Sequence, residues 1–237
     1  MFKYYEIHRF LFQNFFNHCL VVEVMIIRWH GHSCFEITDN IAVITDPHDG
    51  KSLGLPSPIL KGDVILVTHE HFDHSCTRIV KGDYKLINRE GVSRYNNIKF
   101  QGIRTFHDHE KGAKRGTNLI YKFNMGGFEF AHLGDLGCYP DEKVVSLLEN
   151  IDILFIPAGN VFTLSLPEAW KLINECKPKI VIPMHYRIGG LSMSIRPVDP
   201  DFLSMKPEEM EVIRVGNQVE IEPEDIPQSP QLWIFSM

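Results

Sequence analysis

The stretch His69-Glu70-His71-Phe72-Asp73-His74 contains a cluster of side chains typical of metal sites. It places three imidazoles and the carboxylate of Asp73 within six residues, directly after the apolar run at residues 64–67. Neutral imidazole nitrogen and carboxylate oxygen are ligands that zinc and similar divalent ions take, and an all nitrogen and oxygen set leaves room for a reactive water. We therefore expect a strand that ends in a metal-binding loop.

Three further candidate ligands each follow an apolar stretch of sequence. They are His107, Asp135 and His185. Because the ends of several strands meet at one edge of a sheet, such residues converge on a site held by a rigid scaffold. Their number and spacing favour two ions over one. His109 stands two residues after His107 and stays an alternative to it, whereas His132 is expected to be a non-ligand.

With these motifs the chain resembles the metallo-β-lactamase superfamily, and within it the small cytosolic branch that includes ascorbate-6-phosphate lactonase-like hydrolases. The resemblance extends from about Met25 to Ile221. It is carried by the opening strand and turn at residues 25–37, the metal loop at 68–74, the pair Gly134-Asp135, the segment Pro183-Met184-His185-Tyr186 and the glycine-containing segment at 157–163.

The resemblance implies a ligand set for two divalent ions. One ion would be bound by His69, His71 and His107, the other by Asp73, His74 and His185, with Asp135 as the bridge. Two ions about 3.5–4 Å apart need shared anions between them, which a bridging carboxylate and a bridging hydroxide supply. Zn²⁺ is the expected ion, with Mn²⁺ and Fe²⁺ as alternatives.

The sequence departs from the branch beside the bridging residue. Relatives have Thr after Gly-Asp, whereas this chain has Leu136. A hydrogen bond that orients Asp135 in relatives is therefore expected to be missing or replaced. In the opening turn, His30 and His32 are expected to hydrogen-bond to backbone rather than to bind metal.

Hydrophobic periodicity predicts a chain of many strands and a few helices. Strands are predicted near residues 25–29, 34–38, 41–45, 63–67, 85–87, 98–106, 119–123, 128–133, 152–156, 180–184, 212–215 and 218–221. Helices are predicted near 140–149 and 167–175, with shorter ones after His74 and over 199–205. The pattern supports an α/β or α+β class, and the resemblance implies a four-layer αββα sandwich of two mixed sheets.

Length and composition indicate one domain. The chain has 237 residues, of which 44% are hydrophobic, and no linker or repeat divides it. We expect a single metallo-β-lactamase-like domain at residues 25–237 and an N-terminal extension, residues 1–24, outside that fold. Five widely spaced cysteines without a CxxC pair indicate a reducing compartment, and we expect the cytoplasm.

Charge and hydropathy narrow the range of partners. The formal net charge is −6 and the Lys and Arg residues are dispersed, so a nucleic-acid substrate is not expected. Polar residues interrupt the apolar stretch at residues 10–27, so no membrane span is expected. A small-molecule substrate is the expected partner, and homo-oligomerisation stays open.

The implied chemistry is hydrolysis of an ester, lactone, amide or phosphodiester by hydroxide that bridges two divalent ions. Asp73 would also orient the hydroxide, and Tyr186 would donate to a developing oxyanion unless it is simply packed. Candidate contacts to a small, anionic substrate are Asn160, Arg187 and Arg196. A di-iron redox enzyme and a non-catalytic metal-binding or regulatory module are the alternatives.

Overall fold

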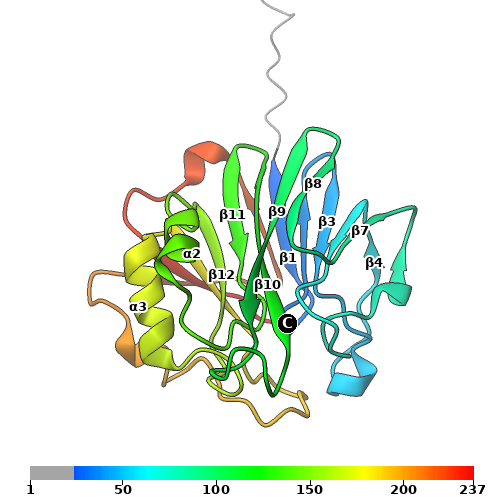
Figure 1. The fold of residues 1–237 in the computed structure, drawn as a ribbon. Helices are drawn as coiled ribbons and strands as arrows, with labels where there is room; N and C mark the ends of the chain where they lie inside the picture. The colour runs from blue at the N-terminus through cyan, green and yellow to red at the C-terminus, as the bar shows by residue number, and fades with distance from the viewer. Residues whose placement is uncertain (1–23) are drawn as a thin grey trace, which may run out of the picture.

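Two β-sheets packed face to face form the centre of the molecule (Figure 1). The computed structural model describes residues 24–237. The smaller sheet has six strands, in the order β15 (Gln218–Ile221), β1 (Met25–Trp29), β2 (Phe35–Thr38), β3 (Ala42–Thr45), β5 (Val64–Leu66) and β7 (Lys85–Ile87). The larger sheet has eight, in the order β14 (Glu211–Arg214), β16 (Gln231–Ile234), β13 (Ile180–Met184), β12 (Ile153–Pro157), β11 (Phe128–His132), β10 (Thr117–Met125), β9 (Ile98–Phe106) and β8 (Gly91–Tyr95). The expected mixed α/β class with two mixed sheets is confirmed.

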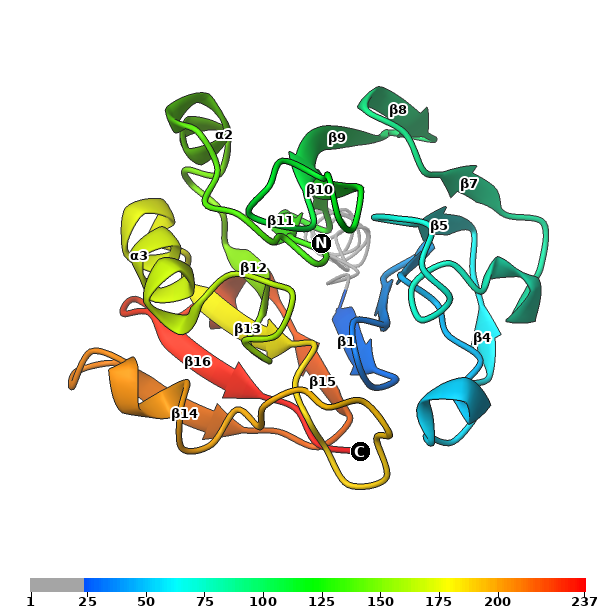
Figure 2. The same ribbon diagram turned by 60° about the horizontal axis from the view of Figure 1, so that its bottom comes forward.

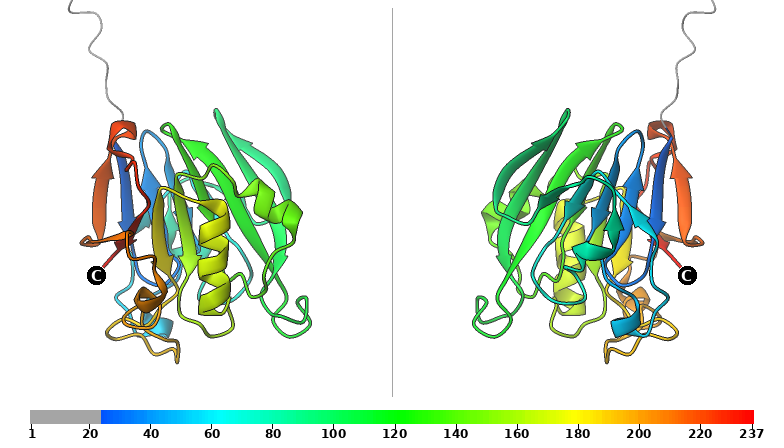
Figure 3. Two further views of the ribbon diagram at one scale, coloured as in Figure 1. Left: turned by 90° about the vertical axis from the view of Figure 1, so that its left-hand side faces the viewer. Right: turned by 90° about the vertical axis from the view of Figure 1, so that its right-hand side faces the viewer.

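The outer faces of the two sheets are covered differently (Figure 3). Helices α2 (Glu142–Leu147) and α3 (Leu166–Cys176) lie on the outer face of the larger sheet. Over the smaller sheet, the described residues place the 3-10 turn η2 (Thr77–Ile79) and a short ribbon of β4 (Leu60–Lys61) and β6 (Val80–Lys81). Leu60 and Val80 of the ribbon join a separate small core with the smaller sheet. The ribbon and η2 therefore cover the face where the four-layer expectation placed a helix. Another 3-10 turn, η1 (Lys51–Leu53), lies below the sandwich, where Leu53 packs with Leu191 and Ile195 (Figure 2).

Aromatic side chains fill the space between the sheets. Phe35 on the smaller sheet and Phe155 on the larger sheet are fully buried, and their ring centroids lie 4.5 Å apart. Phe130 and Phe123 extend this contact along the larger sheet, with successive ring centroids 6.4 Å and 5.0 Å apart. Large buried rings contribute much of the apolar area that holds two sheets together. The sandwich is thus a consequence of apolar residues on the inward faces of both sheets.

Strand direction brings several strand ends to one edge of the sandwich (Figure 2). β3 and β5 are parallel neighbours in the smaller sheet. In the larger sheet β11, β12 and β13 are parallel, and β9 runs in the same direction because β10 is antiparallel to both β9 and β11. The carboxyl ends of β9, β11 and β13 therefore meet at the same edge.

Each predicted strand has a counterpart within about three residues, and four short strands lie outside the prediction: β4, β6, β8 and β16. Two-residue strands such as β4 and β6 are too short to show a period, and β8 forms a hairpin with β9 through Asn96, which has a positive φ of 48°. The helices expected after His74 and over 199–205 are the 3-10 turns η2 and η3 (Leu203–Met205); a further turn, η4, spans Pro223–Asp225. The predicted extension lies outside the described residues apart from Val24. Among residues 24–237, no helix combines the length and apolar character that crossing a bilayer requires.

Candidate metal centre

All seven predicted ligands lie at this edge, at or after the ends of strands. The loop after β5 carries His69, His71, Asp73 and His74, while His107 follows β9, Asp135 follows β11 and His185 follows β13. Six of the seven side chains are buried, and His71 is partly exposed. The chain thus brings donors from both sheets to one place.

The donors fall into two groups with Asp135 between them. His69, His71 and His107 form one group, and Asp73, His74 and His185 form the other together with His32. Asp135 Oδ2 lies 3.1 Å from Nε2 of His185, 3.2 Å from Nε2 of His107 and 3.3 Å from Nε2 of His74. The carboxylate of Asp135 thus lies between the two groups and contacts histidines of both.

Of the two candidate histidines after β9, only His107 reaches the cluster. Its Nε2 faces Asp135, and its Nδ1 donates to the carbonyl of Phe162 at 3.0 Å. The side chain of His109 is 61% exposed and lies 4.0 Å from Glu168. The structure therefore favours the predicted choice of His107.

Buried donor atoms without partners show that the cluster fits a cation. His69 Nε2, His74 Nε2 and Asp135 Oδ1 are buried and have no hydrogen-bond partner. Native proteins rarely leave such atoms unsatisfied unless an ion or water takes them up. Imidazole nitrogens and carboxylate oxygens are also the donor types that divalent transition ions prefer. The residues present thus match the pair of divalent ions that the motif implies.

Asp46 fixes two of these histidines, and the sequence analysis missed it. Its Oδ2 accepts from His74 Nδ1 at 2.9 Å and from the Thr68 hydroxyl at 2.8 Å. Because that hydroxyl already donates to Asp46, it accepts from His69 Nδ1, 3.0 Å away. Both imidazoles therefore donate through Nδ1 and present Nε2 to the cluster. The available signal was its place directly after the apolar strand β3, the same kind of place that marked His107 and Asp135.

His32 corrects one expectation from the sequence. It was expected to hydrogen-bond to backbone, but its Nε2 lies 3.0 Å from Asp73 Oδ2 and its ring centroid lies 4.3 Å from that of His185. Burial and the neighbouring His185 lower the pKa of His32 to about 3, so the ring is neutral. Burial alone would raise the pKa of Asp73, but the hydrogen bond from His32 and the nearby ring of His74 bring it below its usual value, so Asp73 is a carboxylate at neutral pH.

Glycines let the backbone pass close to the centre. A Cβ at Gly137 would lie 2.2 Å from the carbonyl carbon of His107, so only glycine fits there. Gly134 has a φ of +55°, and a Cβ on it would lie 2.3 Å from Asn118 Oδ1. That amide oxygen accepts from the backbone N–H of Asp135 at 2.9 Å. Asn118 thus orients the backbone of Asp135, the residue for which we expected a hydrogen bond from position 136 to be missing or replaced.

The comparisons with known proteins agree with this geometry. Residues 26–185 match the family described as the beta-lactamase superfamily domain. The chain belongs to the beta-lactamase superfamily. A UPF0173 metal-dependent hydrolase from Thermoplasma acidophilum is 29% identical over 195 residues, which cover 72% of this chain and 87% of that protein. A UPF0173 metal-dependent hydrolase from Nanoarchaeum equitans is 32% identical over 227 residues, covering 84% of this chain and all of the relative.

A solved structure extends the similarity to the fold. A protein from Thermotoga maritima, described as a Zn-dependent hydrolase of the metallo-β-lactamase superfamily, superposes with a TM-score of 0.74 at 32% identity. The match covers 89% of this chain and 98% of that one. Family, relatives and donor clusters together identify this superfamily member as a metal-dependent hydrolase.

For Tyr186, the structure favours the packed alternative over the expected catalytic role. Its hydroxyl donates to the carbonyl of Phe235 at 2.8 Å, and its ring stacks on Trp29 with centroids 5.3 Å apart. Burial also raises the pKa of Tyr186. The side chain is therefore part of the core between the sheets, which was the alternative considered for it.

The predicted substrate contacts do not line the mouth of the centre. Arg187 is exposed, and the exposed Arg196 lies 3.4 Å from Asp201. Asn160, with a positive φ of 52°, occupies a turn beside the centre. The cavity over the metal ligands measures about 180 Å³ and is completed by Phe72, Arg115, Phe162 and Met193. None of these four is a predicted contact, because they come from separate segments of the chain.

Proposed function

We propose that the chain uses two divalent cations, Zn²⁺ in the first place, to hydrolyse an ester, lactone, amide or phosphodiester of a small molecule. The position of Asp135 carries this proposal. One of its oxygens lies 3.1 to 3.3 Å from three histidine nitrogens of the cluster, and the other is buried without a partner. Each donor group on either side of it has the residues to hold one ion: His69, His71 and His107 in one, and Asp73, His74 and His185 in the other.

Two bound divalent cations would lower the pKa of water toward neutrality and polarise a carbonyl or phosphoryl oxygen. Side chains of the protein would orient the attacking water. Asp73 is held by His32 and His74 as a carboxylate, and we propose that it accepts a hydrogen bond from the attacking water. Such a contact fixes one lone pair of the water toward the substrate.

None of the four cysteines that the structure describes has an activated thiol, because burial raises the pKa of Cys34, Cys76, Cys138 and Cys176. The thiolate is the reactive form of cysteine, so these side chains are poorly suited to attack. This supports direct attack by water rather than a covalent intermediate.

Metal content tests the ligand assignment. Zinc-loaded wild-type protein should hold two ions per chain by elemental analysis, and Asp135→Ala should lower the content of both because it removes the shared carboxylate. His109→Ala is the matched control, since that exposed histidine lies outside the cluster. Unchanged zinc content in Asp135→Ala would contradict the bridging role.

Activity tests the reaction class. A screen of phosphodiesters, lactones and thioesters should find hydrolysis that a chelator abolishes and that Zn²⁺ or Mn²⁺ restores. Covalent labelling of a side chain by substrate would contradict direct attack by water. Oxygen consumption by the iron-loaded protein, without hydrolysis of any of these compounds, would favour the redox alternative.

A further inference from the structure

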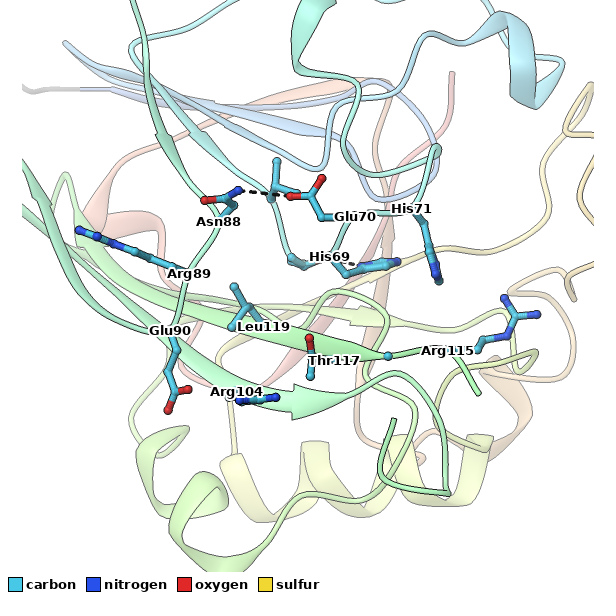
Figure 4. A pocket seen from close by; sticks show the side chains of 13 residues that line it. His69, Glu70, His71, Asn88, Arg89, Glu90, Arg104, Arg115, Thr117 and Leu119 are labelled. Carbon is cyan, nitrogen blue, oxygen red and sulfur yellow. Dashed lines mark hydrogen bonds between the residues drawn. The ribbon is translucent and has the colours of Figure 1, made fainter. Parts of the chain in front are cut away.

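A second cavity opens beside the proposed metal centre and shares residues with it (Figure 4). Its volume is about 490 Å³, within the range of small-molecule sites. Residues 67–71 of the metal loop form one wall, and strands β9 and β10 form the other, as Figure 4 shows. His69 and His71 line the cavity at the end where it meets the centre. A molecule bound at the metal ligands can therefore extend into it.

Three arginines line this cavity, and their guanidinium groups have no carboxylate partner among the described residues. They are Arg89, Arg104 and Arg115. No guanidinium among them forms an ion pair or a side-chain hydrogen bond with another described residue, whereas Arg28 pairs with Glu36 at 2.8 Å. Glu70 and Glu90 also line the cavity, so its lining carries a net charge of +1 from three arginines and two glutamates.

Arg115 connects the cavity to the metal centre. It lines both the 490 Å³ cavity and the 180 Å³ mouth over the ligands. Its guanidinium lies 3.3 Å from the centroid of the Phe162 ring, and the carbonyl of Phe162 accepts from His107. Stacking on an aromatic face leaves the edge of a guanidinium free to donate to an oxyanion. The side chain is thus held in place next to a metal ligand without using its hydrogen-bond donors.

Arg104 lies further along the same wall. It projects from β9 opposite Leu119 of β10, and Thr117 separates it from Arg115 in Figure 4. Arg89 and Glu90 lie at the end of the cavity away from His71. Positive charge without partners therefore faces the middle of the cavity and the end next to the centre.

We propose that this cavity binds an oxyanion, a phosphate or carboxylate group, of the same substrate whose scissile bond lies at the metal centre, with Arg104 and Arg115 as its anchors. This inference rests on the proposed function, because the reacting end of the substrate is placed by the metal ligands. Guanidinium groups suit this role because their forked donors match both oxygens of a carboxylate or phosphate. The substrate is thereby a small molecule with an anionic group remote from the bond that is cleaved.

Anions with one or two charged ends test the proposal by calorimetric titration of zinc-loaded protein. Butyrate has one oxyanion, whereas glutarate and 3-phosphonopropionate have one at each end of a similar chain. Wild-type protein should bind at least one of the two-ended anions about tenfold more tightly than butyrate, as expected for one added charge-assisted contact. A larger advantage for 3-phosphonopropionate would identify phosphate as the recognised group, and a larger one for glutarate would identify carboxylate.

Arginine variants test whether Arg104 and Arg115 bind the oxyanion that lies remote from the metal ligands. The double variant Arg104→Met/Arg115→Met should reduce the advantage to less than about twofold, while Arg94→Met, an exposed arginine on β8 outside the cavity, should keep it. Equal affinity of wild-type protein for one-ended and two-ended anions would overturn the proposal, because the second oxyanion would then have no site. Tighter binding of the two-ended anions that persists in the double variant would also overturn it, because Arg104 and Arg115 would then not be the anchors.

Zinc content measured on the same samples separates this proposal from the proposed function. Wild-type protein that does not hold two ions would remove both proposals. Full zinc loading with no advantage for two-ended anions would remove only the oxyanion site.

Discussion

Single residues outside the ligand motif fix the geometry of the proposed metal centre. Asp46 accepts from His74 directly and orients His69 through Thr68. Its φ of 39° is a backbone conformation that non-glycine residues rarely adopt. Strain of this kind persists only where surrounding contacts over-determine it, and here three hydrogen bonds to Asp46 side-chain oxygens do so.

We expect His32 to control how tightly zinc binds, through its contact with Asp73. The variant His32→Asn should lower the affinity for the zinc ion assigned to Asp73, His74 and His185 by about tenfold or more. The reason is that it removes the contact that holds the Asp73 carboxylate. Zinc titration with a chromophoric chelator measures this directly. His30→Asn is the control, since His30 lies in the same turn but pairs with Glu36 at 3.1 Å. Equal loss in both variants would mean that the turn as a whole, not His32, is required.

Strand ends position the site, and a capped helix covers the larger sheet. Donors come from the loops after β5, β9, β11 and β13, so the edge common to these strands is the scaffold of the centre. Helix α3 covers the larger sheet and starts at a capping box, in which Glu168 Oε2 accepts from the backbone N–H of Ser165 at 2.9 Å. Pro at the first turn suits this start as well.

The cap predicts a stability effect without a functional one. Glu168→Ala should lower the free energy of unfolding by about 1 kcal/mol, the usual size of a lost N-terminal cap. Zinc content should stay unchanged, because Glu168 is not a donor. Lys171→Ala, which removes an exposed pair with Glu175 at 3.8 Å and a cation–π contact with Tyr139 at 4.1 Å, should cost about 0.5 kcal/mol. Denaturant titration compares them; equal losses would mean that the cap adds nothing.

At the scale of the whole molecule, one buried histidine joins the two sheets. His132 on β11 donates through Nε2 to the carbonyl of Ser33, which precedes β2 in the other sheet, and its Nδ1 accepts from Gly134 N–H. With both nitrogens used, the neutral ring is the form that fits. Burial lowers the pKa of His132 below its ordinary value of 6.5.

The lowered pKa of His132 makes the stability of the fold depend on pH. Below pH 6.5 the unfolded chain binds a proton at this residue and the folded chain does not, so the contribution of His132 is present above pH 6.5 and is lost as pH falls. The difference in unfolding free energy between wild type and His132→Gln should therefore shrink as pH falls from 7 to 5.5, by at most about 1.4 kcal/mol per pH unit. A constant difference would show that His132 is protonated in the folded state.

Local patterns in the sequence predict the metal loop, the later candidate ligands His107, Asp135 and His185, and most strand positions, because ligand spacing and apolar periodicity are local properties of the chain. The contacts of His32 and Asp46, the packing of Tyr186 and the arginine-lined cavity appear only in the folded molecule. Each of these depends on contacts between segments far apart in sequence: His32 meets Asp73, and Arg115 stands with residues 67–71 and Phe162. Burial and packing between the two sheets, which no local pattern encodes, set those contacts.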